Sequence, residues 1–124
     1  NDKVTILPLM PINISQMFDE DIQRIPSAEL FSGVKTITSS GGNVTAKMIK
    51  DCKNTFKQAN FYSMHGLTEA FRSTYLDPSQ VQIRPDSIGK AIPDVELYVI
   101  NEDGNKISRS RHKHSVSIFS LTLA

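Results

Sequence analysis

Three short runs that are typical of strands are separated by two amphipathic segments, and this order constrains the fold of the chain more than any other feature of its sequence; the first run is apolar and partly β-branched, and the second alternates. The runs cover residues 4–10, 33–40 and 59–66. Apolar side chains of the first amphipathic segment recur at helical spacing, at Ile14, Met17, Phe18 and Ile22. Strands that alternate with helices over short connections are typical of a parallel sheet covered by helices. The sequence therefore predicts an α/β fold that begins β-α-β-α-β, with a buried first strand and Pro11 in the first turn of the first helix.

The second amphipathic segment follows Gly41-Gly42, and Asn43 is a residue type that commonly caps a helix N-terminus. The apolar face of this segment carries Val44, Met48, Ile49, Cys52 and Phe56. Its opposite face, which we interpret as a solvated surface, carries Lys47, Lys50, Lys53 and Lys57. Cys52 is the single cysteine, so the chain cannot form an internal disulfide. Its place on the apolar face predicts a small buried hydrophobe rather than a reactive thiol.

The second half of the chain predicts a different kind of structure. Residues 76–94 contain three prolines, and we interpret them as an ordered loop that crosses to a new sheet. Residues 95–108 alternate apolar and polar side chains before a tight turn at Asp103-Gly104, which is the signal of a β-hairpin. We therefore expect an α/β subdomain over residues 1–94, the start of an antiparallel β subdomain over 95–108, and a tail over 109–124 that ends in a strand.

Composition and charge exclude several classes of protein. With 39% apolar and 22% charged residues, the sequence is typical of a globular chain rather than a disordered one. No apolar run approaches the ~20 residues that span a bilayer, and the first run, broken by Pro8 and Pro11, does not resemble a signal peptide. We therefore expect a cytoplasmic protein. Without Arg109, Arg111 and Lys113, 11 of the 14 basic residues remain against 13 acidic ones, so we expect no nucleic-acid partner.

Two motifs that suit a ligand site follow predicted strands. Ser40-Gly41-Gly42 comes after the second run, and His65-Gly66-Leu67-Thr68-Glu69 ends the third. Ligands of parallel sheets bind beyond the carboxyl ends of the strands, so the two motifs would border one site. A hydroxyl at Thr68 beside a carboxylate at Glu69 suits a nucleotide triphosphate and its magnesium ion. Taken singly, each motif is also compatible with an ordinary turn or with the start of a helix.

Taken together in their order and spacing, three motifs resemble those of the adenylate-forming (AMP-binding) superfamily, which includes the acyl-CoA synthetases. The glycine turn of residues 40–42 is followed by a helix, then by Gly66-Leu67-Thr68-Glu69, and then by the run DSIGKAIPDVELYVINEDG of residues 86–104. The resemblance covers residues 4–104. Within the family, the runs GLTEAFRSTYL and RPDSIGKAIP look closest to bacterial acyl-CoA ligases associated with exosortase loci.

The resemblance implies an ATP-dependent acid–thiol ligase of the kind that serves fatty acid metabolism, which forms an acyl-adenylate and passes the acyl group to coenzyme A. Thr68 would contact the nucleotide phosphates and Glu69 would hold Mg²⁺, so these two are the expected catalytic residues. The residues expected to border the nucleotide are Ser40, Gly41, Gly42, His65, Gly66 and Thr68. His65 stands where the family usually has a tyrosine against the adenine, and Asn43 replaces the usual alanine.

Several parts of the family's site have no counterpart in the sequence: a glycine-rich phosphate loop, a ribose-binding aspartate and a C-terminal lid domain. We therefore expect an internal piece of the large N-terminal domain, inactive alone, that self-associates through an exposed sheet edge or interface. One alternative is a non-catalytic regulatory or protein-interaction module of the same fold. Another is a flavodoxin-like domain, which Pro8 and Pro11 disfavour. We interpret His112, His114 and Asp19-Glu20-Asp21 as solvated side chains rather than metal ligands.

Overall fold

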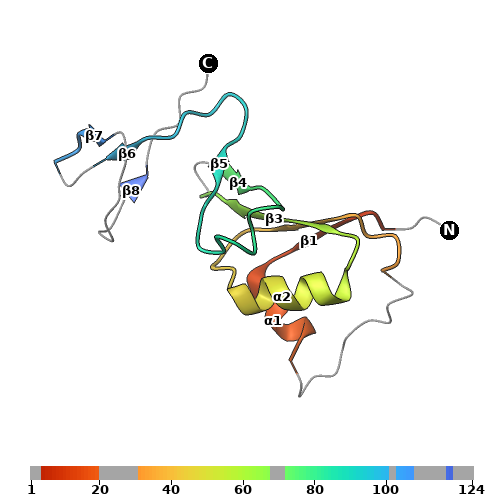
Figure 1. The fold of residues 1–124 in the computed structure, drawn as a ribbon. Helices are drawn as coiled ribbons and strands as arrows, with labels where there is room; N and C mark the ends of the chain where they lie inside the picture. The colour runs from red at the N-terminus through yellow and green to blue at the C-terminus, as the bar shows by residue number, and fades with distance from the viewer. Residues whose placement is uncertain (1–3, 20–30, 68–71, 101–102, 108–116, 119–124) are drawn as a thin grey trace.

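The structure, a computed structural model, describes residues 4–19, 31–67, 72–100, 103–107 and 117–118. Its elements in chain order are β1 (Ile6–Leu9), α1 (Pro11–Met17), β2 (Thr36–Ser39), α2 (Ala46–Thr55), β3 (Asn60–His65), β4 (Thr74–Leu76), β5 (Lys90–Ala91), β6 (Val99–Ile100), β7 (Lys106–Ile107) and β8 (Ser117–Ile118) (Figure 1). The first five alternate between strand and helix, which confirms the predicted β-α-β-α-β order. Ile22, expected on the first helix, lies outside the described residues.

A five-stranded sheet in the order β1-β2-β3-β4-β5 contains the three predicted strands. β1, β2 and β3 are parallel neighbours, as predicted, and β4 and β5 extend the sheet in antiparallel pairing. The prediction that residues 76–94 form only a loop to a new sheet was wrong, because Leu76 ends β4 and β5 pairs with β4. Strands of three and two residues are too short to show a period in the sequence.

Gly89 makes the pairing of β4 with β5 possible. Its φ of +82° favours glycine, and a Cβ atom at this position would lie 1.9 Å from the carbonyl oxygen of Tyr75. The hydroxyl of the buried Thr74 donates a hydrogen bond of 2.6 Å to the carbonyl oxygen of Ile88. The chain therefore crosses β4 in direct backbone contact before it forms β5.

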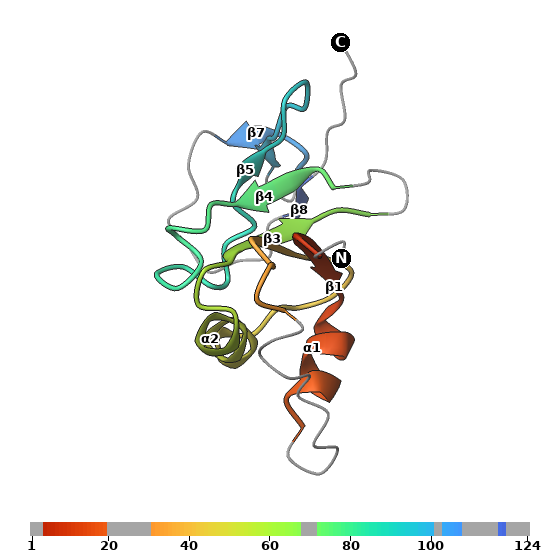
Figure 2. The same ribbon diagram turned by 90° about the vertical axis from the view of Figure 1, so that its right-hand side faces the viewer.

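Both helices lie on the same face of this sheet (Figure 1, Figure 2). The hydrophobic core is made of the buried side chains of Ile14, Val34, Ile37, Val44, Ile49, Cys52, Phe56, Ala59, Phe61, Leu76 and Val81. Side chains alternate along each strand, so Leu7, Ile37 and Phe61, which are paired in register, point to the helices. The residues that alternate with them form what we call the open face: Ile6, Pro8, Thr36, Thr38, Tyr62, Met64, Tyr75 and Lys90.

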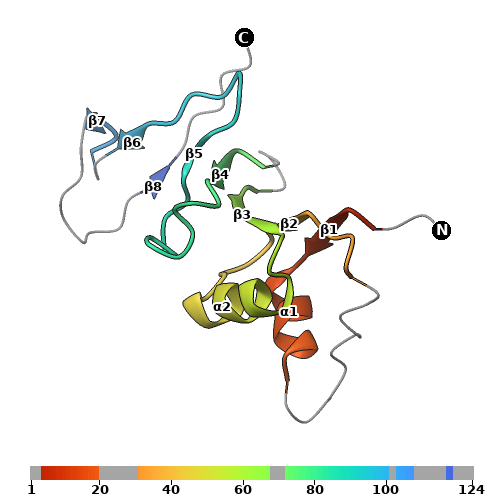
Figure 3. The same cartoon turned by 45° about the vertical axis from the view of Figure 1, so that its right-hand side comes forward.

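The predicted burial of the first strand was wrong. Val4 is 50% exposed and Ile6 is 61% exposed. β1 is an edge strand, and the described part of the chain has no helix on the open face (Figure 3). Apolar composition alone does not tell a strand covered on both faces from one covered on a single face, because both read as short apolar runs.

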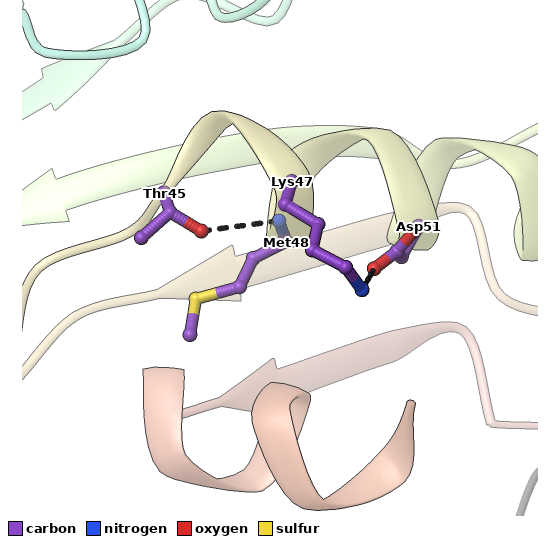
Figure 4. A network of polar contacts seen from close by, with 4 residues as sticks. All are labelled: Thr45, Lys47, Met48 and Asp51. Carbon is purple, nitrogen blue, oxygen red and sulfur yellow. Dashed lines mark hydrogen bonds and ion pairs between the residues drawn. The ribbon is translucent and has the colours of Figure 1, made fainter. Parts of the chain in front are cut away.

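The two faces of α2 agree with the sequence, but its cap does not. The apolar side is buried against the sheet and α1, and Met48 points toward α1 (Figure 4). The predicted cap at Asn43 was wrong: the helix begins at Ala46, and the N-cap is Thr45, whose hydroxyl accepts a 3.3 Å hydrogen bond from the Met48 N–H. On the solvated side Lys47 forms an ion pair of 2.8 Å with Asp51.

A second sheet has β6 at its centre, with β7 and β8 as antiparallel neighbours. β6 and β7 form the predicted hairpin, and Gly104 in its turn has a φ of +81°. In Figure 1 this sheet stands apart from α1 and α2, on the side of β5. The change of sheet falls between Ala91 and Val99, and the subdomain boundary at residue 94 stays a prediction.

Candidate functional site

The carboxyl ends of three parallel strands meet at one edge of the five-stranded sheet. Leu9, Ser39 and Ser63 are paired in register, so β1 and β2 end side by side and β3 runs two residues further, to His65. Immediately beyond these ends lie the chain segments of residues 10–13, 40–43 and 66–67. The structure therefore brings residues 40–42 of the first motif and the described residues 65–67 of the second to the same edge, as the rule for parallel sheets predicts.

The glycine turn packs against the junction of β1 and α1. Gly41 has a φ of +85°, and a Cβ atom there would lie 3.9 Å from Cγ and Sδ of Met10. A Cβ atom at Gly42 would lie 3.3 Å from Cγ of Pro11, which is a tight contact. Gly41, Gly42 and the following Asn43 are exposed. The two glycines thus let a bare backbone run along the edge of the sheet, where a ligand can approach its N–H and C=O groups closely.

Ser39 is the last residue of β2, just before this turn in the chain, and its side chain has an unusual environment. Its side chain is 1% exposed, and its Oγ atom has no hydrogen-bond partner among the described residues. Leaving a buried hydroxyl without a partner costs about 1–3 kcal/mol. Ser63, its neighbour in register on β3, places a second hydroxyl on the same side of the sheet. The end of β2 is therefore more polar than the core around Ile37, two residues earlier on the same face.

The second motif is described only in part. His65 is the last residue of β3, is exposed and pairs in register with Thr74 of β4. Gly66 is half-buried, and Leu67 is 44% exposed. Thr68 and Glu69 lie outside the described residues. Their expected contacts with phosphate and magnesium stay predictions, and so do the expected roles of Ser40, Gly41, Gly42, His65 and Gly66 at the nucleotide.

Sequence reasoning missed the part of this edge that belongs to β1 and α1. Met10 is 52% exposed and Ile12 is 55% exposed, and both follow the carboxyl end of β1. They could have been found by applying the rule for parallel sheets to the first strand, as well as to the second and third. On the open face, Thr38 and Met64 are half-buried near the ends of β2 and β3.

The described residues offer no other centre with a clear chemistry. They contain no group of three or more His, Cys, Asp and Glu side chains that could hold a metal ion. His112, His114, Glu20 and Asp21 lie outside the described residues. Cys52 is fully buried, which confirms the prediction of a small buried hydrophobe, and burial raises the pKa of its thiol to about 12. None of the helices described is long and apolar enough to cross a membrane.

Two hollows border α2 rather than the carboxyl edge. One, of about 350 Å³, lies between α2 and the segment of residues 81–85, and the other, of about 260 Å³, lies between α2 and α1. Neither is lined by residues 40–42 or 65–67. These two hollows therefore do not belong to the candidate site at the carboxyl edge.

Comparison with known proteins gives a family. The model of the family described as AMP-binding enzyme matches residues 1–113. The 2-succinylbenzoate–CoA ligase of Arabidopsis thaliana is 29% identical over 93 residues, which are 62% of this chain and 17% of the relative. VraA of Staphylococcus epidermidis, provisionally named as a long chain fatty acid-CoA ligase, is 26% identical over 107 residues, which are 86% of this chain and 21% of the relative. The chain thus spans about a fifth of the length of these relatives.

Among solved structures, the O-succinylbenzoate coenzyme A synthetase from Bacillus subtilis in complex with AMP is similar with a TM-score of 0.64. The two chains are 20% identical, and the similarity covers 86% of this chain and 20% of that one. At this identity the similarity establishes the fold.

Proposed function

The chain belongs to the AMP-binding enzyme family, and we propose that it forms part of the nucleotide site of an ATP-dependent acid–thiol ligase. The observation that carries this proposal is the meeting of the glycine turn with residues 65–67, the described part of the second motif, at the carboxyl edge, where Gly41-Gly42 is exposed as bare backbone. The names of the two curated relatives, both coenzyme A ligases, support the choice of reaction.

The proposed reaction has two steps. A carboxylate oxygen of the acid attacks the α-phosphorus of ATP, and the bond to pyrophosphate breaks as the acyl-adenylate forms. The thiol of coenzyme A then attacks the acyl carbon, loses its proton and displaces AMP. Charge develops on the phosphate oxygens in the first step, so fixed donors and cations beside them lower the barrier.

The described residues fit a nucleotide better than they fit a metal ion. Backbone N–H groups at a glycine turn suit phosphate or base atoms, and the exposed imidazole of His65 can lie against a base. Magnesium needs only one or two carboxylates besides the phosphates, and in this proposal Glu69 supplies one. When bound, the ion would neutralise charge on the departing pyrophosphate. Thr68 would donate its hydroxyl to a phosphate oxygen.

A titration with ATP, in the presence and absence of Mg²⁺, tests the proposal. We expect saturable binding by the 124-residue chain that strengthens with Mg²⁺ and weakens roughly tenfold or more in Glu69→Ala, by analogy with the loss of a metal-orienting group. Asp86→Ala is the matched control, because Asp86 is an exposed carboxylate outside the carboxyl edge. Equal losses in the two variants would assign the effect to net charge.

The alternative function, a non-catalytic regulatory or protein-interaction module of the same fold, predicts no binding of ATP by either the original chain or the variants. This alternative is supported by the half-buried Tyr62, Met64 and Tyr75 of the open face, because they offer an apolar surface to a partner. Binding that depends on Glu69 would contradict it.

A further inference from the structure

We propose that the hollow between α2 and the segment of residues 81–85 is a second binding site, which takes a small organic anion with a compact apolar body. The hollow lies apart from the carboxyl edge, because neither residues 40–42 nor residues 65–67 line it. The proposal therefore goes beyond the proposed function and does not depend on it. The volume of the hollow, about 350 Å³, falls in the usual range of small-molecule sites, ~300–1,000 Å³.

The floor of this hollow is apolar. Ile49 of α2 is 1% exposed, and Val81, which follows β4 in the chain, is fully buried. The exposed Ala46 and the half-buried Pro85 complete the apolar part of the lining. A ligand in the hollow would therefore contact aliphatic side chains of two segments that are distant in the sequence, and its apolar body would leave water.

The polar side chains that line the hollow favour an anion. Lys50 and Asn54 are one helical turn apart on α2, so they lie on the same side of the helix. Gln82 contributes a second amide from the opposite wall. The ammonium group and the two amide NH₂ groups are hydrogen-bond donors that suit the oxygen atoms of a sulfonate, carboxylate or phosphate. Recognition of an oxyanion next to an apolar body follows from this lining.

Hydrogen bonds fix both walls of the hollow in the absence of a ligand. On one side, the Thr45 hydroxyl caps the N-terminus of α2. On the other side, Asp77 Oδ1 accepts from the N–H and the hydroxyl of Ser79 at 2.9 and 2.7 Å. Gln80 Oε1 accepts from Nε and Nη2 of Arg84 at 3.2 and 2.9 Å. Walls that are already held in place lose less conformational entropy when a ligand binds.

Benzenesulfonate and benzenesulfonamide test the need for a charge, because they have the same ring and differ in one negative charge. A sulfonate is also no substrate for the proposed ligase reaction, which requires a carboxylate. We would titrate each compound into the 124-residue chain and follow the methyl resonances of Ala46, Ile49 and Val81 by NMR. We expect saturable shifts with benzenesulfonate and an affinity for benzenesulfonamide that is about fivefold weaker, the effect of one solvent-exposed charge pair. Equal affinities, or no saturable shift with benzenesulfonate, would overturn the proposal.

Two matched variants separate this site from a general effect of net charge. Lys50→Gln and Lys57→Gln each remove one positive charge from an exposed position, and only Lys50 lines the hollow. Because both positions are exposed, neither change is expected to unfold the chain. Lys50→Gln should weaken benzenesulfonate about threefold and leave benzenesulfonamide unchanged, whereas Lys57→Gln should change neither affinity. Equal weakening of benzenesulfonate by the two variants would contradict the proposal.

Methanesulfonate tests the need for an apolar body, because it keeps the charged group and lacks the ring. We expect its affinity to be about tenfold weaker than that of benzenesulfonate, as follows from the loss of buried apolar area. The methyl shifts of Ile49 and Val81 should be correspondingly small at equal concentration. Equal affinities of the two sulfonates would show that the apolar floor does not contribute, and this result would overturn the proposed class of ligand.

Discussion

At the scale of single residues, Gly89 is the glycine that leaves the least room for a Cβ atom. The Cβ atom of any other residue would lie 1.9 Å from the carbonyl oxygen and 2.3 Å from the carbonyl carbon of Tyr75. These are backbone atoms of a paired strand and cannot move aside cheaply. Gly104 offers a matched comparison, since its φ of +81° is nearly the same and nothing lies within 4 Å of its Cβ position.

We predict that Gly89→Ala lowers the free energy of unfolding by more than about 3 kcal/mol, because it adds a backbone collision to the cost of a positive φ. Gly104→Ala bears only the cost of the positive φ, about 1–2 kcal/mol. Urea unfolding of the two variants, followed by circular dichroism, gives both values. Similar losses would show that the contact between Gly89 and Tyr75 does not form.

For the glycine turn, the sequence predicted its position in the fold but not its contacts. A rule about parallel sheets was enough to bring Gly41, Gly42 and His65 to one edge, because it depends only on strand order and direction. The contacts of Gly41 with Met10 and of Gly42 with Pro11 were not predictable. They depend on how α1 leaves β1, and the spacing of apolar residues carries no information about that angle.

At the scale of elements, the N-cap of α2 lies two residues after the predicted one. Asn43 was predicted because it is a residue type that caps helices and directly precedes Val44, the first residue of the apolar face, but Thr45 is also such a residue type. The Thr45 hydroxyl accepts from the Met48 N–H at 3.3 Å, whereas Asn43 is exposed and belongs to the connection after the glycine turn.

We predict that Thr45→Ala lowers the free energy of unfolding by about 1 kcal/mol, the usual cost of losing an N-cap. Asn43→Ala should change it by less than about 0.5 kcal/mol, as is usual for a surface substitution outside such a feature. Thermal or urea unfolding of the pair provides the measurement. A larger loss of unfolding free energy from Asn43→Ala than from Thr45→Ala would indicate that Asn43, and not Thr45, is the N-cap.

The outer edge of β1 is poorly suited to pairing with another strand. The Thr5 carbonyl oxygen accepts a 3.1 Å hydrogen bond from the Thr36 N–H, so the backbone N–H and C=O groups of Thr5 and of the alternate residues after it point toward β2. The backbone of Pro8 therefore lies on the outer edge of β1. Proline has no N–H to offer there. The next outward N–H, that of Met10, already donates to Asn13 Oδ1 at 3.0 Å. Self-association through this edge stays a prediction, and Pro8 opposes it.

We predict that Pro8→Ala increases self-association, because it restores an N–H at the edge without adding apolar area. Sedimentation equilibrium at several concentrations would show a higher weight-average mass for the variant than for the original chain. Ile6→Thr, on the same strand, serves as the control for lost apolar surface and should lower the mass or leave it unchanged. An unchanged mass in Pro8→Ala would mean that the edge of β1 does not mediate assembly.

The strands of this sheet were predicted unequally, for a physical reason. β1, β2 and β3 lie next to amphipathic helices whose 3.6-residue period fixes the alternation of elements. β4 and β5 have no such neighbour and are formed by long-range pairing, with a glycine that fits against Tyr75. The burial of β1 was wrongly predicted because β1 lies at the edge of the sheet. The spacing of apolar residues in the sequence does not reveal the order of the strands in a sheet.

At the scale of the whole molecule, the described part of the candidate site lies along the carboxyl edge of the five-stranded sheet. Its described residues are a bare turn, an imidazole and an apolar surface, and no carboxylate or lysine is among residues 10–13, 40–43 and 65–67. Binding at such an edge requires fewer functional groups than catalysis does, since contact with a base or an acyl chain requires only a complementary surface. Phosphoryl chemistry also needs charges fixed beside the reacting phosphate.

We predict on this basis that the 124-residue chain is inactive as a ligase even if it binds ATP. The direct measurement is exchange of labelled pyrophosphate into ATP, which reports the first half-reaction and needs no thiol. Octanoate should produce no exchange above the level found without acid, because residues 10–13, 40–43 and 65–67 add no lysine or arginine to the one metal ion that Glu69 would hold beside the departing pyrophosphate. Exchange that requires octanoate and is lost in Glu69→Ala would contradict this prediction, and it would mean that one carboxylate and its metal ion, beside a glycine turn, suffice for acyl-adenylate formation.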